Sequence, residues 1–248
     1  MANRSYLFAT DKIPANYEDR PETITGLSEW PYDIPIAYLL LVSQDTRVCA
    51  SLSFLSEEED NEPLALAGTA AGGTARLKRL LELLAGSRAG AADGNFLAAR
   101  KAAMAFIAAH AQPFLYLETA EIDAMSGDPF AKSIAANIAA VRRFASLVDQ
   151  LTPETIDAAI APGGALAGVL VEPGRHEERE LPALGVGGIW SETLWLAPRN
   201  KANFEPDDEE DFEPDSEPAR VPDAGRPPLA NPRRGTIWQR LRRWLPGY

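Results

Sequence analysis

The composition of the chain changes abruptly close to residue 199, and this change limits the part of the chain that can fold. The stretch that follows is rich in proline, contains almost no aliphatic side chains and carries nine acidic residues between positions 205 and 217. Such a segment buries too little apolar surface to offset the entropy that is lost on ordering. We therefore predict a folded domain over residues 1–198 and a disordered acidic linker over residues 199–232.

The last residues of the chain, 233–248, have a different pattern. Their apolar side chains fall on one helical stripe, which consists of Ile237, Trp238, Leu241, Trp244 and Leu245. Five arginines make the same segment basic. We predict a basic amphipathic helix that contacts a partner protein, its own acidic linker or, weakly, an anionic membrane surface. Its candidate contact residues are Trp238, Arg240, Leu241 and Trp244.

Residues 1–198 carry enough apolar material for a core. The whole chain of 248 residues is 46% hydrophobic and 8% aromatic, which is typical of a globular protein. Four segments have a cap residue followed by apolar residues at helical spacing. We predict four helices on this basis, and they begin near Thr74, Asp93 or Asn95, Asp128-Pro129 and Thr152.

Short apolar runs between these helices predict strands. The strands cover residues 5–9, 114–117, 167–171 and 190–197. The run at 36–42 is compatible with either a strand or a helix, whereas residues 26–35, with two prolines, are expected to form an ordered irregular segment. The fold class that follows is mixed α/β and helix-rich, with a single domain of short strands packed with about four helices.

Charge and cysteine content restrict the function and the compartment. The formal net charge of −12 argues against a nucleic-acid-binding protein, because phosphate binding requires a surface excess of Lys and Arg. This acidity favours solubility or a basic partner. The single cysteine, Cys49, excludes an intrachain disulfide, and the first residues lack the basic and apolar pattern of a secretory signal. We expect a cytoplasmic protein without a membrane-spanning segment.

Three short motifs lie near the two ends of the predicted domain. They are MANRSYL at residues 1–7, GLSEW followed by YDIP within residues 26–35, and WSETLW at residues 190–195. With these motifs the chain resembles a family of uncharacterised bacterial proteins that is defined as a domain of unknown function. The resemblance implies a bacterial origin and a domain that extends from the first residue to about residue 198, but it implies no catalytic residue.

Several carboxylates follow the predicted strand at 114–117. They are Glu118, Glu121, Asp123 and, further along the chain, Asp128. Carboxylates in such a position can bind a divalent metal ion or act as an acid–base pair. No metal-loop spacing and no partner histidine accompanies them. A solvated acidic loop is therefore the favoured interpretation, and we assign no metal site, no cofactor and no catalytic residue.

Three further patterns have a simple structural interpretation. The glycine-rich segment Gly68–Thr74 precedes a predicted helix but lacks the Gly-Lys-Ser/Thr ending of a phosphate-binding loop, which favours an ordinary flexible turn. The two histidines, His110 and His176, are too far apart for a zinc-binding helix, and His110 ends an apolar stripe. Cys49 is expected to be a small buried hydrophobic residue rather than a nucleophile.

Large aromatic residues lie in two short segments close to the opposite ends of the domain; they are Trp30, Tyr32, Trp190 and Trp195. If the two segments meet in space, Glu29 and Glu192 flank an aromatic cleft that can recognise a partner protein. The alternative is that these side chains anchor the core. On the first interpretation the binding residues are Glu29, Trp30, Tyr32, Trp190 and Glu192.

The sequence thus favours a non-enzymatic interaction protein, such as an immunity or adaptor protein that neutralises a partner protein. Two alternatives are kept. One is a metal-dependent enzyme that uses the acidic residues after the strand at 114–117. The other is a peripheral membrane protein that associates through the helix at 233–248.

Overall fold

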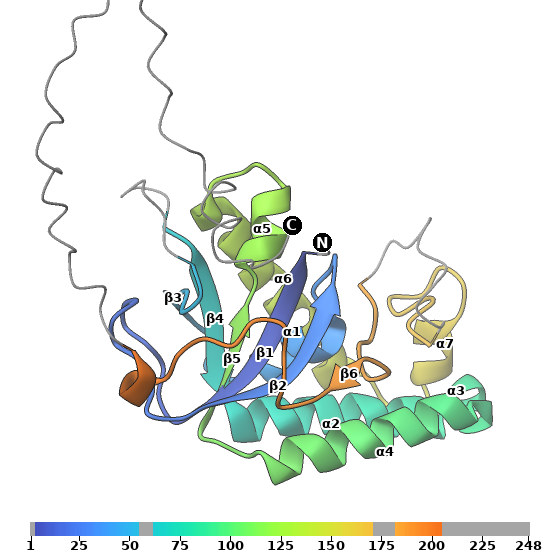
Figure 1. Cartoon of the computed structure of the whole chain (residues 1–248). Helices are drawn as coiled ribbons and strands as arrows, with labels where there is room; N and C mark the ends of the chain where they lie inside the picture. The colour runs from blue at the N-terminus through green and yellow to red at the C-terminus, as the bar shows by residue number, and fades with distance from the viewer. Residues whose placement is uncertain (1–2, 55–61, 171–181, 205–248) are drawn as a thin grey trace, which may run out of the picture. The chain divides into compact units, whose positions relative to one another are not determined.

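An antiparallel sheet of six strands forms the centre of the described structure. The computed structural model describes residues 3–54, 62–170 and 182–204, which belong to one compact unit, Met1–Phe204. The strand order is β3-β4-β5-β1-β2-β6, and each neighbouring pair is antiparallel (Figure 1). The strands are β1 (Arg4–Thr10), β2 (Ile24–Pro31), β3 (Arg47–Ala50), β4 (Leu64–Thr69), β5 (Phe114–Glu118) and β6 (Ile189–Trp190).

Seven α-helices accompany the sheet in the described residues, more than the four that we predict from sequence. They are α1 (Ile36–Leu41), α2 (Ala70–Gly86), α3 (Arg88–Ala92), α4 (Gly94–Ala109), α5 (Ala120–Met125), α6 (Phe130–Gln150) and α7 (Ile156–Ile160). The mixed α/β, helix-rich class is therefore confirmed. Two predicted helix starts are confirmed as well. The Asp93 side chain accepts a hydrogen bond from the N–H of Phe96 and caps α4, and α6 begins directly after Pro129.

One other predicted helix start is wrong. Helix α2 begins at Ala70, directly after β4, so Thr74 lies inside the helix and does not cap it. The predicted cap at residues 152–155 is confirmed, because the short helix α7 begins at Ile156 with Thr155 as its N-cap residue, and the residues before it form a turn. In this turn the N–H of Thr152 donates to Oγ1 of Thr155 at 2.9 Å, and the N–H of Thr155 donates to the carbonyl of Thr152 at 3.1 Å.

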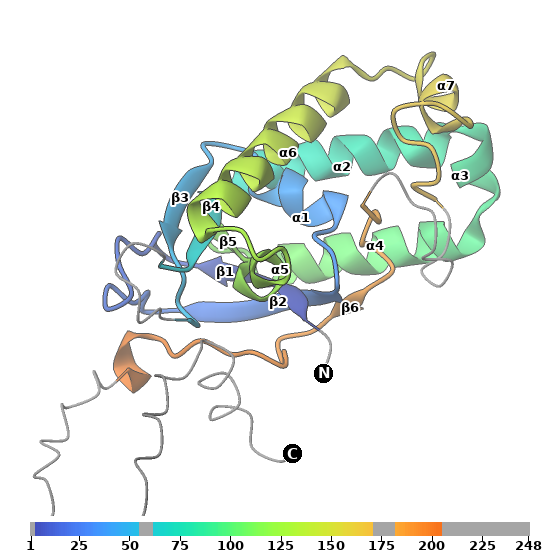
Figure 2. The same cartoon turned by 90° about the horizontal axis from the view of Figure 1, so that it is seen from above.

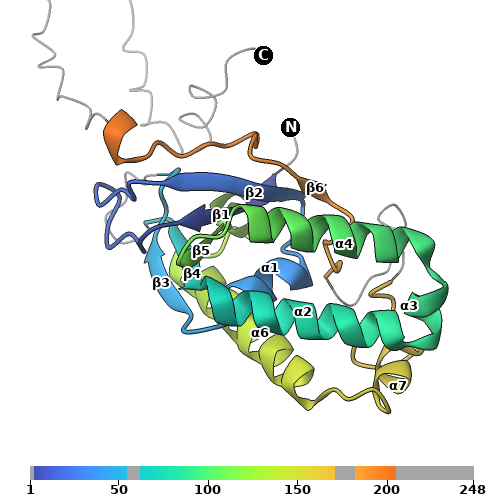
Figure 3. The same cartoon turned by 90° about the horizontal axis from the view of Figure 1, so that it is seen from below.

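The long helices cover one face of the sheet. Helices α1, α2, α4 and α6 lie on the same side of it, as Figures 2 and 3 show. Successive side chains of a strand point to opposite faces, so alternate strand residues such as Leu7, Leu66 and Leu117 reach these helices. Helix α2 buries leucines at a spacing of three and four residues, namely Leu77, Leu80, Leu81 and Leu84. The main hydrophobic core lies between these two layers.

Helices α1 and α2 approach each other closely at a glycine. Residues 36–42, for which the sequence leaves strand and helix open, contain the helix α1, and all six of its residues are buried. A Cβ atom at Gly73 would lie 2.6 Å from the carbonyl carbon of Leu41 and nearer still to its oxygen. The segment Gly68–Thr74 passes from β4 straight into α2. This segment is therefore not the flexible turn that we predict. Its Gly73 allows α1 and α2 to pack closely.

Irregular chain with a short 3-10 helix, η2 (Lys201–Asn203), covers the second face of the sheet. It includes residues 191–204, which we call the strap and which run across this face in Figures 1 and 3. Leu194 and Leu196 of the strap pack on the sheet together with Leu52. The side chains that they cover form a second, smaller core cluster that consists of Tyr6, Phe8, Cys49, Ala65, Ala67 and Tyr116.

Three predicted strand assignments are wrong. Residues 24–31 form β2 and pair with β1 along their whole length, where an irregular segment is expected. Residues 167–170 form turns, and Gly168 has a φ of 78°, which a strand does not adopt; position 171 lies outside the described residues. The last strand is limited to Ile189–Trp190, because the chain then leaves the sheet edge and becomes the strap.

The folded unit extends to Phe204, six residues beyond the predicted boundary. The guanidinium of Arg20, in the loop between β1 and β2, lies 4.0 Å from the ring centre of Tyr17 and 4.3 Å from that of Phe204. Lys201 donates its N–H to the carbonyl of Pro21 at 2.9 Å and its ammonium to Glu22 at 2.7 Å. Residues 199–204 therefore belong to the strap, because cation–π and polar contacts hold them on the domain.

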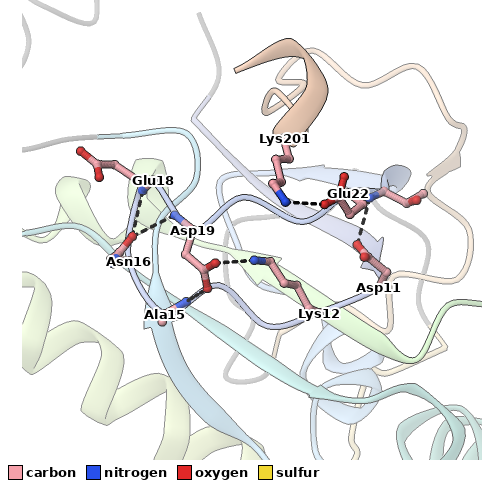
Figure 4. Close-up of polar contacts among 9 residues, drawn as sticks. Asp11, Lys12, Ala15, Asn16, Glu18, Asp19, Glu22 and Lys201 are labelled. Atoms are coloured by element: carbon pink, nitrogen blue, oxygen red, sulfur yellow. Dashed lines mark hydrogen bonds and ion pairs between the residues drawn. The ribbon is translucent and has the colours of Figure 1, made fainter. Parts of the chain in front are cut away.

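The loop between β1 and β2 is braced by its own side chains, as Figure 4 shows. Asp19 pairs with Lys12 and also accepts the N–H of Ala15 at 3.0 Å. Asn16 accepts the N–H groups of Glu18 and Asp19. This loop is therefore a rigid support to which the strap is fastened.

The remaining tail assignments fall outside the described residues. They comprise positions 205–232 of the predicted linker and the predicted helix at 233–248, with Trp238, Arg240, Leu241 and Trp244.

Candidate functional site

Exposed apolar side chains gather at the edge of the sheet formed by β2 and β6. The large hydrophobic residues that are exposed in the described structure are Tyr32 (62%), Val48 (44%), Met125 (50%), Ile189 (62%) and Trp195 (57%). Three of these surround the end of β2. Ile189 lies opposite Glu29 in the ladder, Tyr32 follows the last residue of β2, and Trp195 donates its backbone N–H to Glu29 at 2.7 Å. We call Tyr32, Ile189 and Trp195 the edge surface.

An ion pair lies at the centre of the edge surface and orders it. Nε of Arg4 lies 3.4 Å from Oε1 of Glu29, and both side chains are largely buried. The guanidinium of Arg4 also lies over the ring of Trp195, 5.5 Å from its centre. Glu29 therefore holds both the backbone of Trp195 and the cation that stacks on its ring. The exposed indole is fixed in place rather than free to fold back.

Tyr32 is held by its backbone. Its φ of 63° lies in the left-handed region, which costs a non-glycine residue on the order of 1 kcal/mol. Its N–H donates to the carbonyl of Asn3 at 2.7 Å. This hydrogen bond to the residue before β1 stabilises the left-handed conformation of Tyr32. The phenol ring remains exposed to solvent.

The first and last segments of the domain meet, as the cleft hypothesis requires. Ser28 and Glu29 of β2 pair with Trp190 and Ile189 of β6. The two indoles of these strands, however, pack inward. Trp30 is buried and packs against Gly188, and Trp190 is half-buried against the main core.

Trp190 contributes to the main core rather than to the surface. Its ring lies 6.4 Å from that of Tyr38 and 6.5 Å from that of Phe106, and its Nε1 donates to the carbonyl of Val186 at 3.1 Å. Trp30 and Trp190 therefore anchor the core, which is the alternative that the sequence left open. Within the predicted set, Tyr32 is the aromatic residue whose side chain is largely exposed.

Glu192 forms an ion pair with His110 beside the edge surface. Nε2 of His110 lies 2.6 Å from Oε1 of Glu192, and Nδ1 lies 2.9 Å from the carbonyl oxygen of Phe106. Both ring nitrogens face acceptors, so the geometry favours the doubly protonated ring. The carbonyl of Phe106 and the carboxylate of Glu192 raise the pKa of His110 accordingly. The other histidine, His176, lies outside the described residues.

Glu118 is the most deeply buried of the candidate carboxylates. Its Oε2 accepts hydrogen bonds from Oγ of Ser51 at 2.8 Å and from the hydroxyl of Tyr116 at 2.9 Å. Its Oε1 accepts the N–H of Ala120 at 3.3 Å. Burial raises the pKa of Glu118 to about 7, although these three bonds act in the opposite direction.

The other carboxylates form separate networks. Glu121 accepts the N–H of Arg4 at 2.8 Å and the hydroxyl of Tyr6 at 3.1 Å. Asp123 accepts the hydroxyl of Thr119 at 2.6 Å and the side-chain amide of Asn137 at 3.0 Å. Burial raises the pKa of Glu121 and that of Asp123.

These carboxylates are not the solvated loop that we predict, because β5 and α5 carry Glu118 and Asp123 into buried positions and Glu121 into a half-buried one. Only Asp128 matches that prediction, since it is exposed and pairs with Lys132 at 2.9 Å. In the described ranges no three His, Cys, Asp or Glu side chains come together as a metal site would require.

Cys49 is buried on the second face of the sheet, as predicted. Burial raises the pKa of its thiol, with the charge of Glu118 as a smaller cause. The neutral thiol packs as a small hydrophobic group.

A family model describes most of this domain. The model of a domain of unknown function, DUF7822, matches residues 11–161, which include β2 to α7 with the motif at 26–35. The chain belongs to this family. The motifs at 1–7 and 190–195 lie outside the matched residues, so the match supports neither of them. No curated protein and no solved structure gives a significant match. Among the described residues of this family member, none of the helices has the length and apolarity to cross a bilayer.

Sequence patterns identify the edge surface only in part. Trp195 belongs to the aromatic group that the sequence indicates, and it points outward because its neighbours Leu194 and Leu196 pack on the sheet. Arg4 and Ile189 have no sequence signal of their own. Only the pairing of β1 and β6 with β2 brings them to this site.

Proposed function

We propose that this domain is a non-enzymatic interaction protein of the immunity or adaptor type, which binds a basic partner protein through the edge surface. The observation that carries the proposal is the exposure of Tyr32, Ile189 and Trp195 at one end of the sheet. Aromatic residues held in place on an otherwise polar surface are typical anchors of protein interfaces.

The rigidity of the edge surface supports this role. Binding orders side chains at a cost of about 0.5–1.5 kcal/mol for each flexible side chain that becomes fixed. Trp195 is already stacked on Arg4 and bonded to Glu29, and Tyr32 is fixed by its backbone. Trp195 therefore loses little side-chain freedom when a partner covers it, and the backbone of Tyr32 is already ordered.

Charge indicates the chemistry of the partner. The chain has a formal net charge of −12. At the edge surface itself, Glu29 and Glu192 are paired with Arg4 and His110, so the attraction comes from the charge of the whole chain. A basic protein would be attracted to such a chain over long distances, and its association would slow as ionic strength increases. An acidic protein that inhibits a basic enzyme has the same complementarity of net charge.

The two alternatives have less support from the described residues. The carboxylates of a metal-dependent enzyme would have to converge, but Glu118, Glu121 and Asp123 bind different protein groups. Peripheral membrane association depends on positions 233–248, which lie outside the described structure.

Site-specific photo-crosslinking of the full chain in a lysate of the cells that produce it tests the proposal. A benzophenone amino acid is placed at Tyr32 or at Ile189 in two separate variants. The matched control places it at Val48, an exposed hydrophobic residue on the opposite edge strand. We expect one discrete adduct with a basic protein from each edge-surface position, and its yield should fall when the ionic strength of the lysate is raised before irradiation.

A competition experiment tests whether the adduct depends on the edge surface. An excess of wild-type protein should suppress the adduct, whereas an excess of Trp195→Ala should suppress it poorly. If Val48 gives the same adduct, if folded variants at Tyr32 and Ile189 give none, or if Trp195→Ala competes as well as wild type, the edge surface is not the binding site.

A further inference from the structure

The segment that follows β3 is tied to the sheet by a compact set of hydrogen bonds. Leu52 donates its N–H to the hydroxyl oxygen of Tyr116 at 2.8 Å, and Ser51 donates its hydroxyl to Glu118 at 2.8 Å. Oγ of Ser51 also accepts the N–H groups of Ser53 and Phe54 at 3.2 and 3.0 Å. Two buried side chains of β5, Tyr116 and Glu118, therefore control how this segment is held.

The hydroxyl of Tyr116 lies between two competing acceptors. It is 3.0 Å from the carbonyl oxygen of Ala50 and 2.9 Å from Oε2 of Glu118. A phenol has a single proton, so it can donate to only one of them at a time. The protonation state of Glu118 decides which one is chosen.

With Glu118 protonated, a continuous chain of bonds forms. The carboxyl group donates to the oxygen of Tyr116, and Tyr116 donates to the carbonyl of Ala50. With Glu118 ionised, Tyr116 must turn its proton to the carboxylate, and Ala50 loses this donor. We propose that Tyr116 and Glu118 form a proton-operated clamp, which fastens residues 50–54 to the sheet when Glu118 is protonated and loosens them when it is ionised.

The surroundings of Glu118 make it the group that titrates. Tyr6 of β1, Cys49 of β3 and Tyr116 of β5 are its titratable neighbours on the packed strands, and burial raises the pKa of each, so they stay neutral. On α5, the carboxyl groups of Glu121 and Asp123 are turned to other partners. The same burial brings the pKa of Glu118 to about 7.

Cations do not compensate the charge of Glu118 in the described part of the chain. The guanidinium of Arg20 belongs to the same network, but it donates to the carbonyl of Leu52 and not to the carboxylate. An ionised Glu118 is therefore a buried charge with hydrogen-bond donors but no counterion. The clamp connects it through Leu52 to Arg20, and through Arg20 to Phe204 at the end of the folded unit. This device is independent of the proposed partner-binding function.

Amide hydrogen exchange of the full chain between pH 5.5 and 8.5 tests the clamp. Rates are converted to protection factors, which removes the intrinsic effect of pH on exchange. If local opening returns Glu118 to an ordinary pKa, protection of residues 50–54 in the wild type should fall by about 30-fold across this range. Glu118→Gln, a neutral side chain of the same shape, should show protection that does not change with pH. Glu82→Gln, at an exposed position on α2, should behave like the wild type.

A second measurement needs no variant of Glu118. The carboxyl carbon of Glu118, followed by NMR in the wild type, should titrate with the same midpoint as the protection of the Leu52 amide. Tyr116→Phe should lower this protection at every pH, because Leu52 and Ala50 both lose their partner. Protection that stays constant in the wild type, or that falls equally in Glu118→Gln, would overturn the clamp. So would a carboxyl midpoint below pH 5.

Discussion

Replacement of Gly73 by alanine is a sharp test of how the helical layer is packed. The added Cβ atom would lie 2.6 Å from the carbonyl carbon of Leu41 and closer still to the oxygen. Ordinary contact between such atoms requires about 3.5–4 Å, so α1 and α2 would have to separate by more than about 1 Å. The obstacle is backbone at the end of α1, a helix whose residues are all buried, and it cannot rotate away as a side chain can.

The size of the effect follows from two opposing terms. Overpacking of a core costs typically 1–3 kcal/mol and more where backbone must move, so about 4 kcal/mol is a reasonable value here. Alanine in place of glycine inside a helix returns about 1 kcal/mol. We expect Gly73→Ala to lower the free energy of unfolding by about 3 kcal/mol. For a domain of this size the melting temperature should fall by about 6–12 °C.

The assay is thermal and urea unfolding followed by circular dichroism, with a control in the same helix. Gly86 is the last residue of α2, and a Cβ atom there has nothing within 4 Å. Gly86→Ala should therefore leave stability unchanged or raise it by up to about 1 kcal/mol. If Gly73→Ala is as stable as Gly86→Ala, the close contact between α1 and α2 does not exist and the arrangement of the helical layer is incorrect.

Two further predictions concern the second face of the sheet. The pKa of Glu118 is raised from 4.5 to about 7 in the folded state, so the folded state binds this proton more tightly than the unfolded state does. The proton therefore stabilises the fold fully below pH 4.5, and this stabilisation is lost as pH rises through 7. The unfolding free energy of Glu118→Gln relative to wild type should increase by about 2–3 kcal/mol between pH 5 and 8, and parallel pH profiles in urea titrations would contradict this. Phe204 packs against Arg20, so in the same titrations a chain ending at residue 204 should be more stable than one ending at 198, by about 1–2 kcal/mol. Equal stability of the two chains would show that the folded domain ends at residue 198.

Much of the architecture follows from local sequence patterns. The strands at 5–9 and 114–117, the stripe of leucines in α2 and the cap at Asp93 are all visible, because each depends on residues within a few positions of one another. Membership of a family defined as a domain of unknown function, which we predict by resemblance, is shown by the match over residues 11–161.

Other features depend on contacts between distant residues, so local patterns do not indicate them. Prolines suggested an irregular segment at 26–35, yet pairing with β1 makes most of it a strand. The acidic residues after β5 look solvated, but the register of the sheet places Glu118 between Ala65 and Tyr6 on a covered face. Phe204 looks like part of the linker until Arg20, far away in sequence, stacks on it.

Binding by the edge surface is the central claim, and the affinity of the crosslinked partner for alanine variants tests it most directly. The purified partner is titrated with wild type, with Trp195→Ala and with Val48→Ala, whose exposed side chain lies on β3, the opposite edge strand of the sheet. A central aromatic anchor contributes at least about 2 kcal/mol, so Trp195→Ala should weaken binding by about 30-fold or more while Val48→Ala binds like wild type. Equal affinities for all three proteins would contradict the proposed function.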